Sequence, residues 1–282
     1  MNYKRSKYFL TTTKRKIKHL YLNAKSQIAV VFFHGFMSDM IGNKPRTIQK
    51  FCRKRKINFL KFEYSGHGKS NGEFIEGNIS KWTNEAKQLI RSKVGKDKNL
   101  IFIGSSMGRW IALNLFASFK KQLKGFIGIA SAPEFLEELM WKKFNNQIKK
   151  IIIENKIYHL EHGEFIYPIT KQLIFDGRKN KVLNSKINLK IPIVLFHGTK
   201  DKVVPLKFSK KIFKICKKSK RKIIKIKNGD HSLSRKSDLK KICNELNSLI
   251  LNIYLNQTAF IVFAFMLKGF ISLSNISFGQ TC

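Results

Sequence analysis

Acidic residues are scarce in this 282-residue chain. Its 17 Asp and Glu stand against 56 Lys and Arg, which gives a formal net charge of +39. Such an excess would first suggest nucleic-acid binding. Lys, however, occurs in nearly every segment, together with Ile, Asn and Phe, whose codons are rich in A and T. The basic runs 53–56 and 217–222 lie at the ends of expected helices and are interpreted as solvated faces. We therefore expect no specific nucleic-acid partner.

Cysteine and proline are scarce too, with four and five residues. Cys52, Cys216, Cys243 and Cys282 have neither C-x-x-C nor metal-ligand spacing, so we expect reduced thiols and a cytoplasmic location. No Pro-rich or Gly/Ser-rich linker and no internal repeat divides the chain. The first twenty residues are basic and lack an apolar core, which argues against a secretory signal.

What the chain does have is a hydrophobic fraction of 43%, enough for a large buried core. Continuous apolar runs, typical of strands buried on both faces of a sheet, alternate with helical patterns. After a strand pair within residues 8–22, strands are expected at 27–33, 57–64, 99–103, 125–130, 191–196 and 222–227. Helices are expected at 44–56, 79–93, 107–119, between the last two strands and at 237–255. This alternation predicts a doubly wound, mostly parallel α/β sheet that binds ligands at the carboxyl ends of its strands.

Residues 133 to about 185 interrupt the alternation. Apolar residues recur there at helical spacing: Phe135, Leu136, Leu139, Met140, Phe144, Ile148, Ile151 and Ile152. Two interpretations are open. The insertion forms a helical lid over a cleft at the carboxyl edge of the sheet, or it is an ordinary pair of packing helices.

Residues 104–108, Gly-Ser-Ser-Met-Gly, match the G-x-S-x-G pattern, and their context strengthens the match. An apolar strand ends at Gly104 and a helix begins just after Ser106. Such a strand-to-helix turn is strained and needs small flanking residues, which Gly104 and Gly108 provide. The helix N-terminus favours an anionic intermediate beside Ser106. Ser106, rather than the adjacent Ser105, is therefore the predicted nucleophile.

A serine hydroxyl needs a base, and seven histidines compete for that role. His231 lies in a polar loop after the last expected strand and completes the order nucleophile, acid, histidine. Asp201 follows strand 191–196 and is predicted to accept the Nδ1 proton of His231, fixing its tautomer. The adjacent Asp230 is poorly placed to reach the ring.

The other histidines have weaker claims. His34 and His197 each precede a glycine at the end of a strand, where we interpret them as shaping loops, and His67 lies in a loop flanked by glycines. His159 and His162 fall in the insertion and suggest surface roles, and His19 has no evident partner.

An oxyanion hole needs two backbone N–H donors. We predict the amide of Met107, which follows the nucleophile, and the amide of Phe36, in the loop after the first core strand. Gly35 permits the tight turn that aims the second amide inward.

Together, segments 34–40, 64–70, 104–110, 197–205 and 229–231 resemble the α/β-hydrolase family. The Gly-Ser-Ser-Met-Gly-x-Trp elbow and the Met-Trp pair at 140–141 resemble its mitochondrial palmitoyl-protein thioesterase branch, also known as an acyl-glucuronide esterase, and bacterial relatives.

This resemblance implies an α/β-hydrolase domain over residues 1–256, with the insertion at about 133–185. It also implies a Ser-Asp-His triad that cleaves acyl thioesters or esters through an acyl-enzyme, with no metal and no organic cofactor. The substrate would be a small acyl compound or an acylated protein. A serine peptidase of the same fold and a noncatalytic ligand-binding protein stay open as alternatives.

Three features depart from the branch. Arg109 stands where a second glycine is usual, so its side chain is expected either to turn away along the surface or to obstruct the cleft. Glu63 replaces the usual aspartate. Residues 257–282 form an additional tail whose nine apolar residues, 259–267, are too few to span a membrane alone, so a packing helix is favoured over membrane contact.

Overall fold

The computed structural model describes residues 7–163, 165–185 and 187–274, with side chains up to residue 258 except that of residue 162. The chain divides into two compact units, Met1–Cys243 and Asn244–Cys282. Helix α7, Lys236–Ser274, begins in the first unit and continues through the second.

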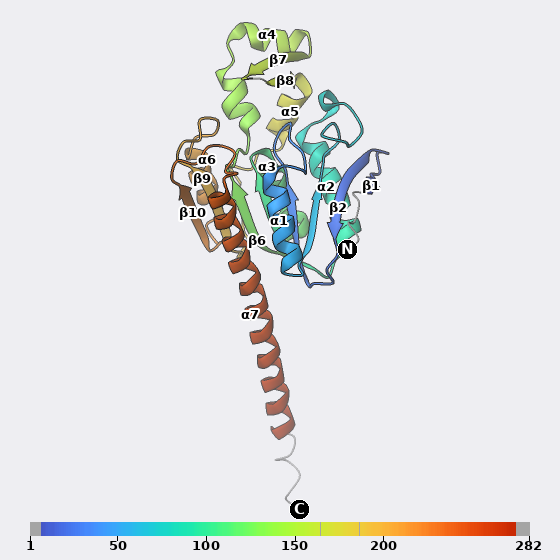
Figure 1. The fold of residues 1–282 in the computed structure, drawn as a ribbon, viewed down its shortest axis with the longest axis vertical. Coiled ribbons are helices and arrows are strands. Elements are labelled where there is room, and N and C mark those ends of the chain that lie inside the picture. Colours follow the sequence, from blue (N-terminus) through green and yellow to red (C-terminus); the bar gives the residue numbers. More distant parts are fainter. Residues whose placement is uncertain (1–6, 164, 186, 275–282) are drawn as a thin grey trace, which may run out of the picture. The chain divides into compact units, whose positions relative to one another are not determined.

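Among the described residues of the first unit, eight strands form one sheet in the order β1-β2-β4-β3-β5-β6-β9-β10 (Figure 1). The strands are β1 Lys7–Leu10, β2 Lys16–Leu22, β3 Ile28–Phe33, β4 Asn58–Phe62, β5 Asn99–Ser105, β6 Leu123–Ile129, β9 Ile193–Gly198 and β10 Arg221–Ile226. From β4 to β10 neighbouring strands are parallel, whereas β1, β2 and β4 pair antiparallel. The predicted α/β-hydrolase fold is thereby confirmed.

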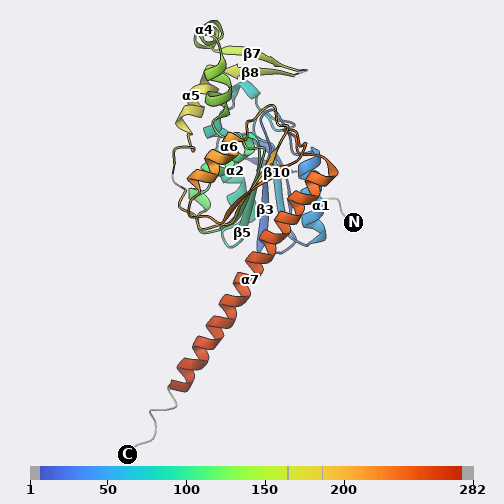
Figure 2. The ribbon, with the colours of Figure 1, turned by 90° about the vertical axis from the view of Figure 1, so that its left-hand side faces the viewer.

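Helices cover both faces of this sheet. Helix α1, Asn43–Lys54, lies on one face, and α2, Ile79–Val94, and α6, Lys207–Ile215, lie on the other (Figure 2). Helix α3, Met107–Asn114, packs against β5 and α2. Because both faces are covered, every residue of β3, β4 and β9 is buried. This explains why β3 is a continuous apolar run and why β4 and β9 are mostly apolar, with Asn58, Lys61 and His197 as buried polar exceptions.

Residues 133–185, which we call the covering segment, contain more than helices. The helical pattern corresponds to the short turns η3, Leu136–Met140, and η4, Trp141–Lys143, and to α4, Asn146–Glu154. An antiparallel hairpin follows, β7 Ile157–His162 with β8 Phe165–Thr170, and then α5, Lys171–Lys179. The sequence pattern did not predict this hairpin. Its β-branched and aromatic residues favour strands, and Pro168 excludes a helix interior.

The two ends of the covering segment meet at a buried carboxylate. Oε1 of Glu134 accepts hydrogen bonds from the backbone N–H groups of Val182, at 2.7 Å, and Leu183, at 2.6 Å. Nearby, the indole N–H of Trp110 on α3 donates to the Asn180 carbonyl at 2.7 Å. The segment therefore leaves the sheet and returns to it at one place, beside the helix that follows Ser106.

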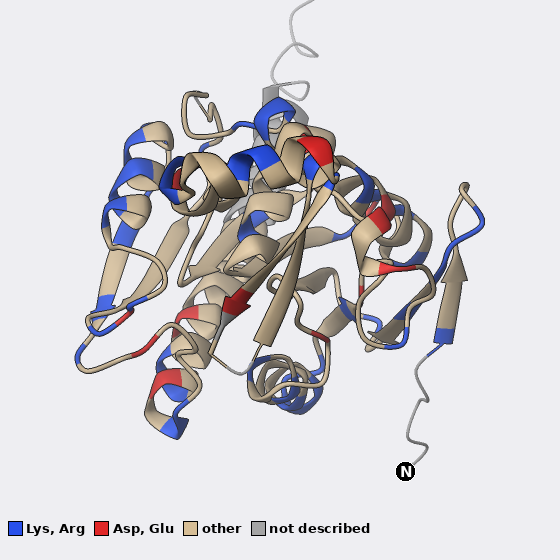
Figure 3. Ribbon diagram, turned by 90° about the horizontal axis from the view of Figure 1, so that it is seen from above, with Lys and Arg blue, Asp and Glu red and all other residues tan. Residues whose placement is uncertain are grey.

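Lys and Arg residues are distributed over the helices and loops of the ribbon in Figure 3, and Asp and Glu residues are few. They do not gather into one stripe in that view. The expectation of no specific nucleic-acid partner stays a prediction.

In the second unit, the backbone of α7 is helical as far as Ser274. The side chains of the apolar run 259–267 and all of residues 275–282, including Cys282, lie outside the described residues, so the proposed packing role of the tail stays a prediction. None of the helices within the described ranges is long and apolar enough to cross a bilayer.

Candidate active site

Ser106 lies on the sharp turn between β5 and α3. Its backbone has φ of 50° and ψ of −118°, a left-handed conformation that is strained for a residue with a side chain. A Cβ added to Gly108 would lie 2.2 Å from the Phe33 carbonyl oxygen, and one added to Gly104 would lie 2.5 Å from the Arg109 Cα. Both positions therefore require glycine, as the strained elbow predicts.

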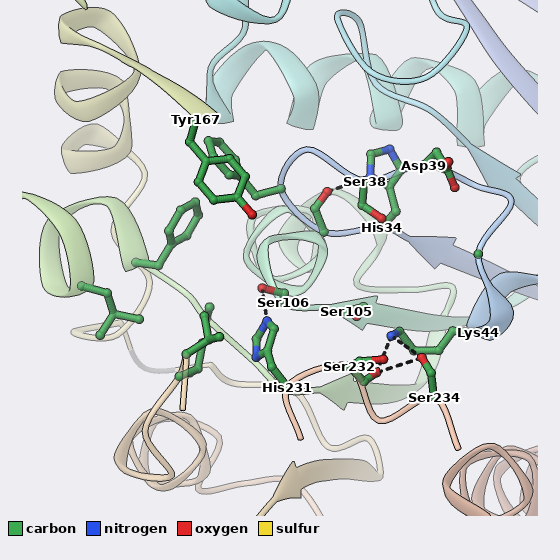
Figure 4. A pocket seen from close by; sticks show the side chains of 18 of the residues that line it. His34, Ser38, Asp39, Lys44, Ser105, Ser106, Tyr167, His231, Ser232 and Ser234 are labelled. Atoms are coloured by element: carbon green, nitrogen blue, oxygen red, sulfur yellow. Dashed lines mark hydrogen bonds between the residues drawn. The ribbon is translucent and has the colours of Figure 1, made fainter. Parts of the chain in front are cut away.

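The structure brings the three predicted catalytic side chains together, although they are far apart in the sequence. Nε2 of His231 lies 3.2 Å from Oγ of Ser106, a hydrogen bond drawn in Figure 4. Nδ1 of the same ring lies 2.9 Å from Oδ2 of Asp201. These two contacts connect a hydroxyl, an imidazole and a carboxylate in the order that proton transfer requires.

Asp201 is held so that one carboxylate oxygen remains for the histidine. Its Oδ1 accepts hydrogen bonds from the N–H groups of Val203, at 2.9 Å, and Val204, at 2.8 Å, while Oδ2 faces His231. The Asp201 side chain is fully buried. Burial alone would raise the pKa of this carboxyl, but the hydrogen bond and charge of His231 and the two backbone donors outweigh it and lower the pKa. Asp201 is therefore kept ionised. Asp230 instead accepts from the N–H of Leu233.

The loop after β3 approaches Ser106 closely. A Cβ built on Gly35 would lie 3.5 Å from the Ser106 Cβ, so the loop backbone passes directly beside the hydroxyl. Phe36 begins a tight turn in which Met37 has a φ of 47°. The N–H groups of Phe36 and Met107 donate to no other group of the described chain. Both amides thus have the free donor that the oxyanion-hole prediction needs.

Four of the remaining histidines are buried in the fold. His34 accepts from the N–H of Tyr64 through Nε2 and contacts the Gly35 carbonyl through Nδ1, and burial lowers its pKa well below the usual value. His197 bonds to Ser209 and to the Val204 carbonyl, and so orders the loop that carries Asp201. These partners fit the loop-shaping role expected for both.

His67 and His19 are likewise buried, at 3% exposure each. His67 bonds to the Ser65 carbonyl, and burial lowers its pKa to about 4. His19 lies on β2 and contacts the Ile17 carbonyl, so it does have a partner, whereas His159 is exposed on the covering segment as expected.

Arg109 adopts neither of the two expected positions. Its side chain is completely buried beneath α3 and does not line the cleft, so it neither turns along the surface nor obstructs the site. The guanidinium packs on Gly128 and lies 5.2 Å from the ring centroid of Phe126. Its three nitrogen atoms have no hydrogen-bond partner among the described residues, and burial lowers its pKa to about 9. The absence of a side chain on Gly128 provides the space that Arg109 fills.

Ser106 and His231 open into a cleft of about 550 Å³ with two kinds of wall. The apolar wall comes largely from the covering segment and the loops beside it: Phe36, Phe135, Leu139, Met140, Leu160, Tyr167, Val203 and Val204. The polar wall comes from the loop after β3, the start of α1 and the loop after His231, and includes Ser38, Asn43, Lys44, Ser232 and Ser234. In Figure 4, Tyr167 lies on one side of Ser106 and His231, and Lys44, Ser232 and Ser234 lie on the other.

Two residues of this site were missed in the sequence. Glu134 closes the covering segment, and Lys44 reaches the loop that carries His231. Neither stands in a recognisable motif, because each acts through a contact with residues far away in the chain. The only available signal for Glu134 was an acidic residue after Pro133 in a chain poor in acids.

Within the described ranges, no three His, Cys, Asp or Glu side chains are grouped so that they could hold a metal ion.

Comparison with known proteins finds similar sequences. Residues 24–164, half of the chain, match the family described as serine aminopeptidase, S33. The human mitochondrial palmitoyl-protein thioesterase ABHD10 is 27% identical over 227 residues, which cover 78% of this chain and 72% of the relative.

Two solved structures are similar as well. A putative hydrolase from Agrobacterium vitis superposes with a TM-score of 0.82 at 27% identity, covering 87% of this chain and 98% of the other. The α/β hydrolase domain-containing protein 10 from mouse superposes with a TM-score of 0.80 at 24% identity, covering 88% and 99%. The second likeness bears on the fold alone.

Proposed function

Since the chain belongs to the α/β-hydrolase family, we propose that it hydrolyses acyl esters and thioesters through Ser106, His231 and Asp201. The family match, to the serine aminopeptidase S33 group, covers residues 24–164. The observation that carries the proposal is the pair of contacts made by His231, at 3.2 Å to the Ser106 hydroxyl and at 2.9 Å to the Asp201 carboxylate.

In the first half of the reaction, Ser106 Oγ attacks the acyl carbonyl carbon while Nε2 of His231 takes the hydroxyl proton. Asp201 stabilises the imidazolium that forms. The bond from carbon to the leaving sulfur or oxygen then breaks, and His231 returns its proton to the leaving atom. Water, deprotonated by the same nitrogen, attacks the acyl-enzyme, and the acid is released with Ser106 restored.

Negative charge develops on the carbonyl oxygen in both halves. The N–H groups of Phe36 and Met107 have no other partner among the residues that the structure describes, and they lie on the two segments that flank Ser106. We assign them to the oxyanion hole. Loss of one such donor typically costs about a hundredfold to a thousandfold in turnover.

The acyl group is proposed to lie against the apolar wall of the cleft. Because most of that wall belongs to the covering segment, we propose that this segment acts as a lid. The name of the human relative, a palmitoyl-protein thioesterase, supports an acyl thioester as one substrate. The free thiols of Cys52, Cys216 and Cys243 support a reducing, cytoplasmic location.

An aminopeptidase is the second candidate, because the matched family carries that description. A free N-terminal ammonium would need an anionic partner in the cleft. Asp39 is the one acidic side chain among the described cleft residues, and its Oδ1 already accepts from the N–H of Ile41. Three lysines, Lys44, Lys143 and Lys202, also line the cleft. This balance of charge favours esters and thioesters over peptides with a free amino end.

Labelling with a fluorophosphonate probe tests the nucleophile. The native protein should react, Ser106→Ala should not, and Ser105→Ala is the matched control, because it removes the neighbouring hydroxyl that also lines the cleft. Turnover of p-nitrophenyl butyrate should fall in Ser106→Ala by about three powers of ten or more.

The substrate class is tested with three panels: p-nitrophenyl acyl esters, acyl thioesters and amino-acid anilides. The proposal expects the first two to be hydrolysed faster than the third. Faster hydrolysis of anilides would establish the peptidase instead. Native protein that neither reacts with the probe nor turns over any panel would indicate a noncatalytic binding protein.

A further inference from the structure

Lys44 differs from the other cations of the cleft. The side chains of Lys143 and Lys202 are exposed, whereas Lys44 is half-buried beside the catalytic histidine. Its ammonium donates to the Ser232 carbonyl and, at 3.2 Å, to the Ser234 hydroxyl. No carboxylate of the described chain lies within ion-pair distance of it. A desolvated ammonium with only neutral partners is an incompletely satisfied charge.

The charges around Lys44 also favour an anionic ligand. Burial lowers the pKa of Lys44, and the charge of Asp230 opposes this effect without forming an ion pair. A negative group bound at this end of the cleft would stabilise the ammonium. An ammonium has three N–H donors, and Ser232 and Ser234 take two of them, so one donor is left for a ligand.

The position of Lys44 identifies which part of a substrate it meets. His231 must protonate the leaving atom, so the leaving group lies on the His231 side of Ser106. Lys44 bonds to the residue directly after His231, on the side of the cleft away from Tyr167 (Figure 4). The acyl chain is directed to the opposite, apolar wall. Lys44 is thus placed to contact the leaving group and not the acyl chain.

Building on the proposed function, we propose that Lys44 is a specificity-determining residue that selects substrates whose leaving group carries a carboxylate close to the scissile bond. The carboxylate could belong to a small alcohol or thiol, or to an acidic residue beside an acylated cysteine in a peptide.

The first arm of the test uses two small esters of equal shape, 3-carboxy-4-nitrophenyl butyrate and its neutral carboxamide. Native protein should prefer the carboxylate in kcat/KM by about tenfold or more, the usual worth of a charge-assisted hydrogen bond. Lys44→Met should lower this ratio to about one. Lys44→Arg should keep a preference, and Lys202→Met, which removes an equal charge from the same cleft, should keep the full ratio.

The second arm uses S-octanoyl peptides with Asp or Asn directly after the acylated cysteine. A Lys44-dependent preference for Asp identifies acylated proteins as the source of the carboxylate. The same preference confined to the nitrophenyl pair identifies a small leaving group.

The proposal is overturned if Lys44→Met leaves the ratio unchanged. In particular, an equal loss on both esters would make Lys44 a positioning residue for the loop at His231. If native protein hydrolyses neither ester, the proposed function fails, and binding of the two free nitrophenols, measured calorimetrically, decides the anion site separately. If the carboxylated nitrophenol binds native protein but not Lys44→Met, the anion site is supported. If the substitution does not affect its binding, the anion site is rejected.

Discussion

The carboxyl edge of the sheet and the covering segment form two walls of one cleft, but they are built differently. At the edge, Ser106, Asp201 and His231 are held by a strained backbone turn and by hydrogen bonds of 2.8 to 3.2 Å. The covering segment contributes mainly apolar side chains and joins the sheet at its two ends, through Glu134. Under the proposed function, the edge would determine the chemistry and the covering segment would determine which substrate binds. Each prediction below tests this contrast.

The largest effect is expected at the edge. Asp201→Asn should lower kcat for ester hydrolysis by about ten-thousandfold, because an amide cannot stabilise the imidazolium and favours the wrong His231 tautomer. Steady-state kinetics with p-nitrophenyl butyrate measure this loss, and Asp230→Asn is the matched control. A comparable loss in the control would place the acid of the triad at residue 230.

A second effect concerns the packing beneath the edge. Arg109→Met should raise the free energy of unfolding by about 1–3 kcal/mol, since it removes an unpaired buried charge and retains most of the volume. Urea denaturation measures the change, with Arg109→Lys as the variant that keeps the charge. Lower stability in Arg109→Met would mean that the contact with the Phe126 ring outweighs the cost of burying the guanidinium.

A smaller effect is expected in the covering segment. Leu139→Trp should reduce kcat/KM for p-nitrophenyl laurate by about tenfold relative to the acetate, because the larger side chain shortens the apolar wall. Ile166→Trp is the control, since Ile166 is 58% exposed on the same segment and does not line the cleft. If the laurate-to-acetate ratio of kcat/KM in Leu139→Trp equals that of native protein, the acyl chain does not lie against this wall.

The most gradual effect is on the pH dependence of stability. Burial lowers the pKa of His67 to about 4, and its Nε2 has no described partner that could accept a proton. Below the unfolded-state pKa of about 6.5, the unfolded chain binds a proton that the folded chain does not. Stability at this site should therefore fall from about pH 6.5 towards pH 4, by up to about 1.4 kcal/mol per pH unit.

Urea titrations between pH 7.5 and 4.5 measure that slope. His67→Gln should reduce it by about one proton, whereas His159→Gln, on the exposed hairpin, should not change it. An unaltered slope in His67→Gln would mean that folding does not lower the pKa of His67.

The sheet and the arrangement of Ser106, Asp201 and His231 could be predicted because each produces a recognisable pattern in the local sequence. A buried parallel strand is a continuous apolar run, and a strained elbow needs glycine at fixed offsets, as at Gly104 and Gly108. The hairpin at residues 157–170 gives no such signal, because its strands are only partly buried and polar residues such as His159 and Glu161 interrupt the apolar ones.

Other features depend on distant residues and could not be predicted. Arg109 is buried because Gly128, on another strand, leaves a space for it. Lys44 reaches a serine loop 188 positions away in the chain. Nothing in the sequence near either residue indicates these partners, since the fold alone brings them together.

The contact of Glu134 with Val182 and Leu183 has a consequence for how this protein can diverge. The two ends of the intervening fifty or so residues are held together at a single carboxylate. A change in the length of this segment therefore need not move the strands on either side. A shorter, longer or differently folded segment could connect the same two points without moving the proposed catalytic residues Ser106, Asp201 and His231. New substrate preferences could thus arise by replacement of the whole covering segment.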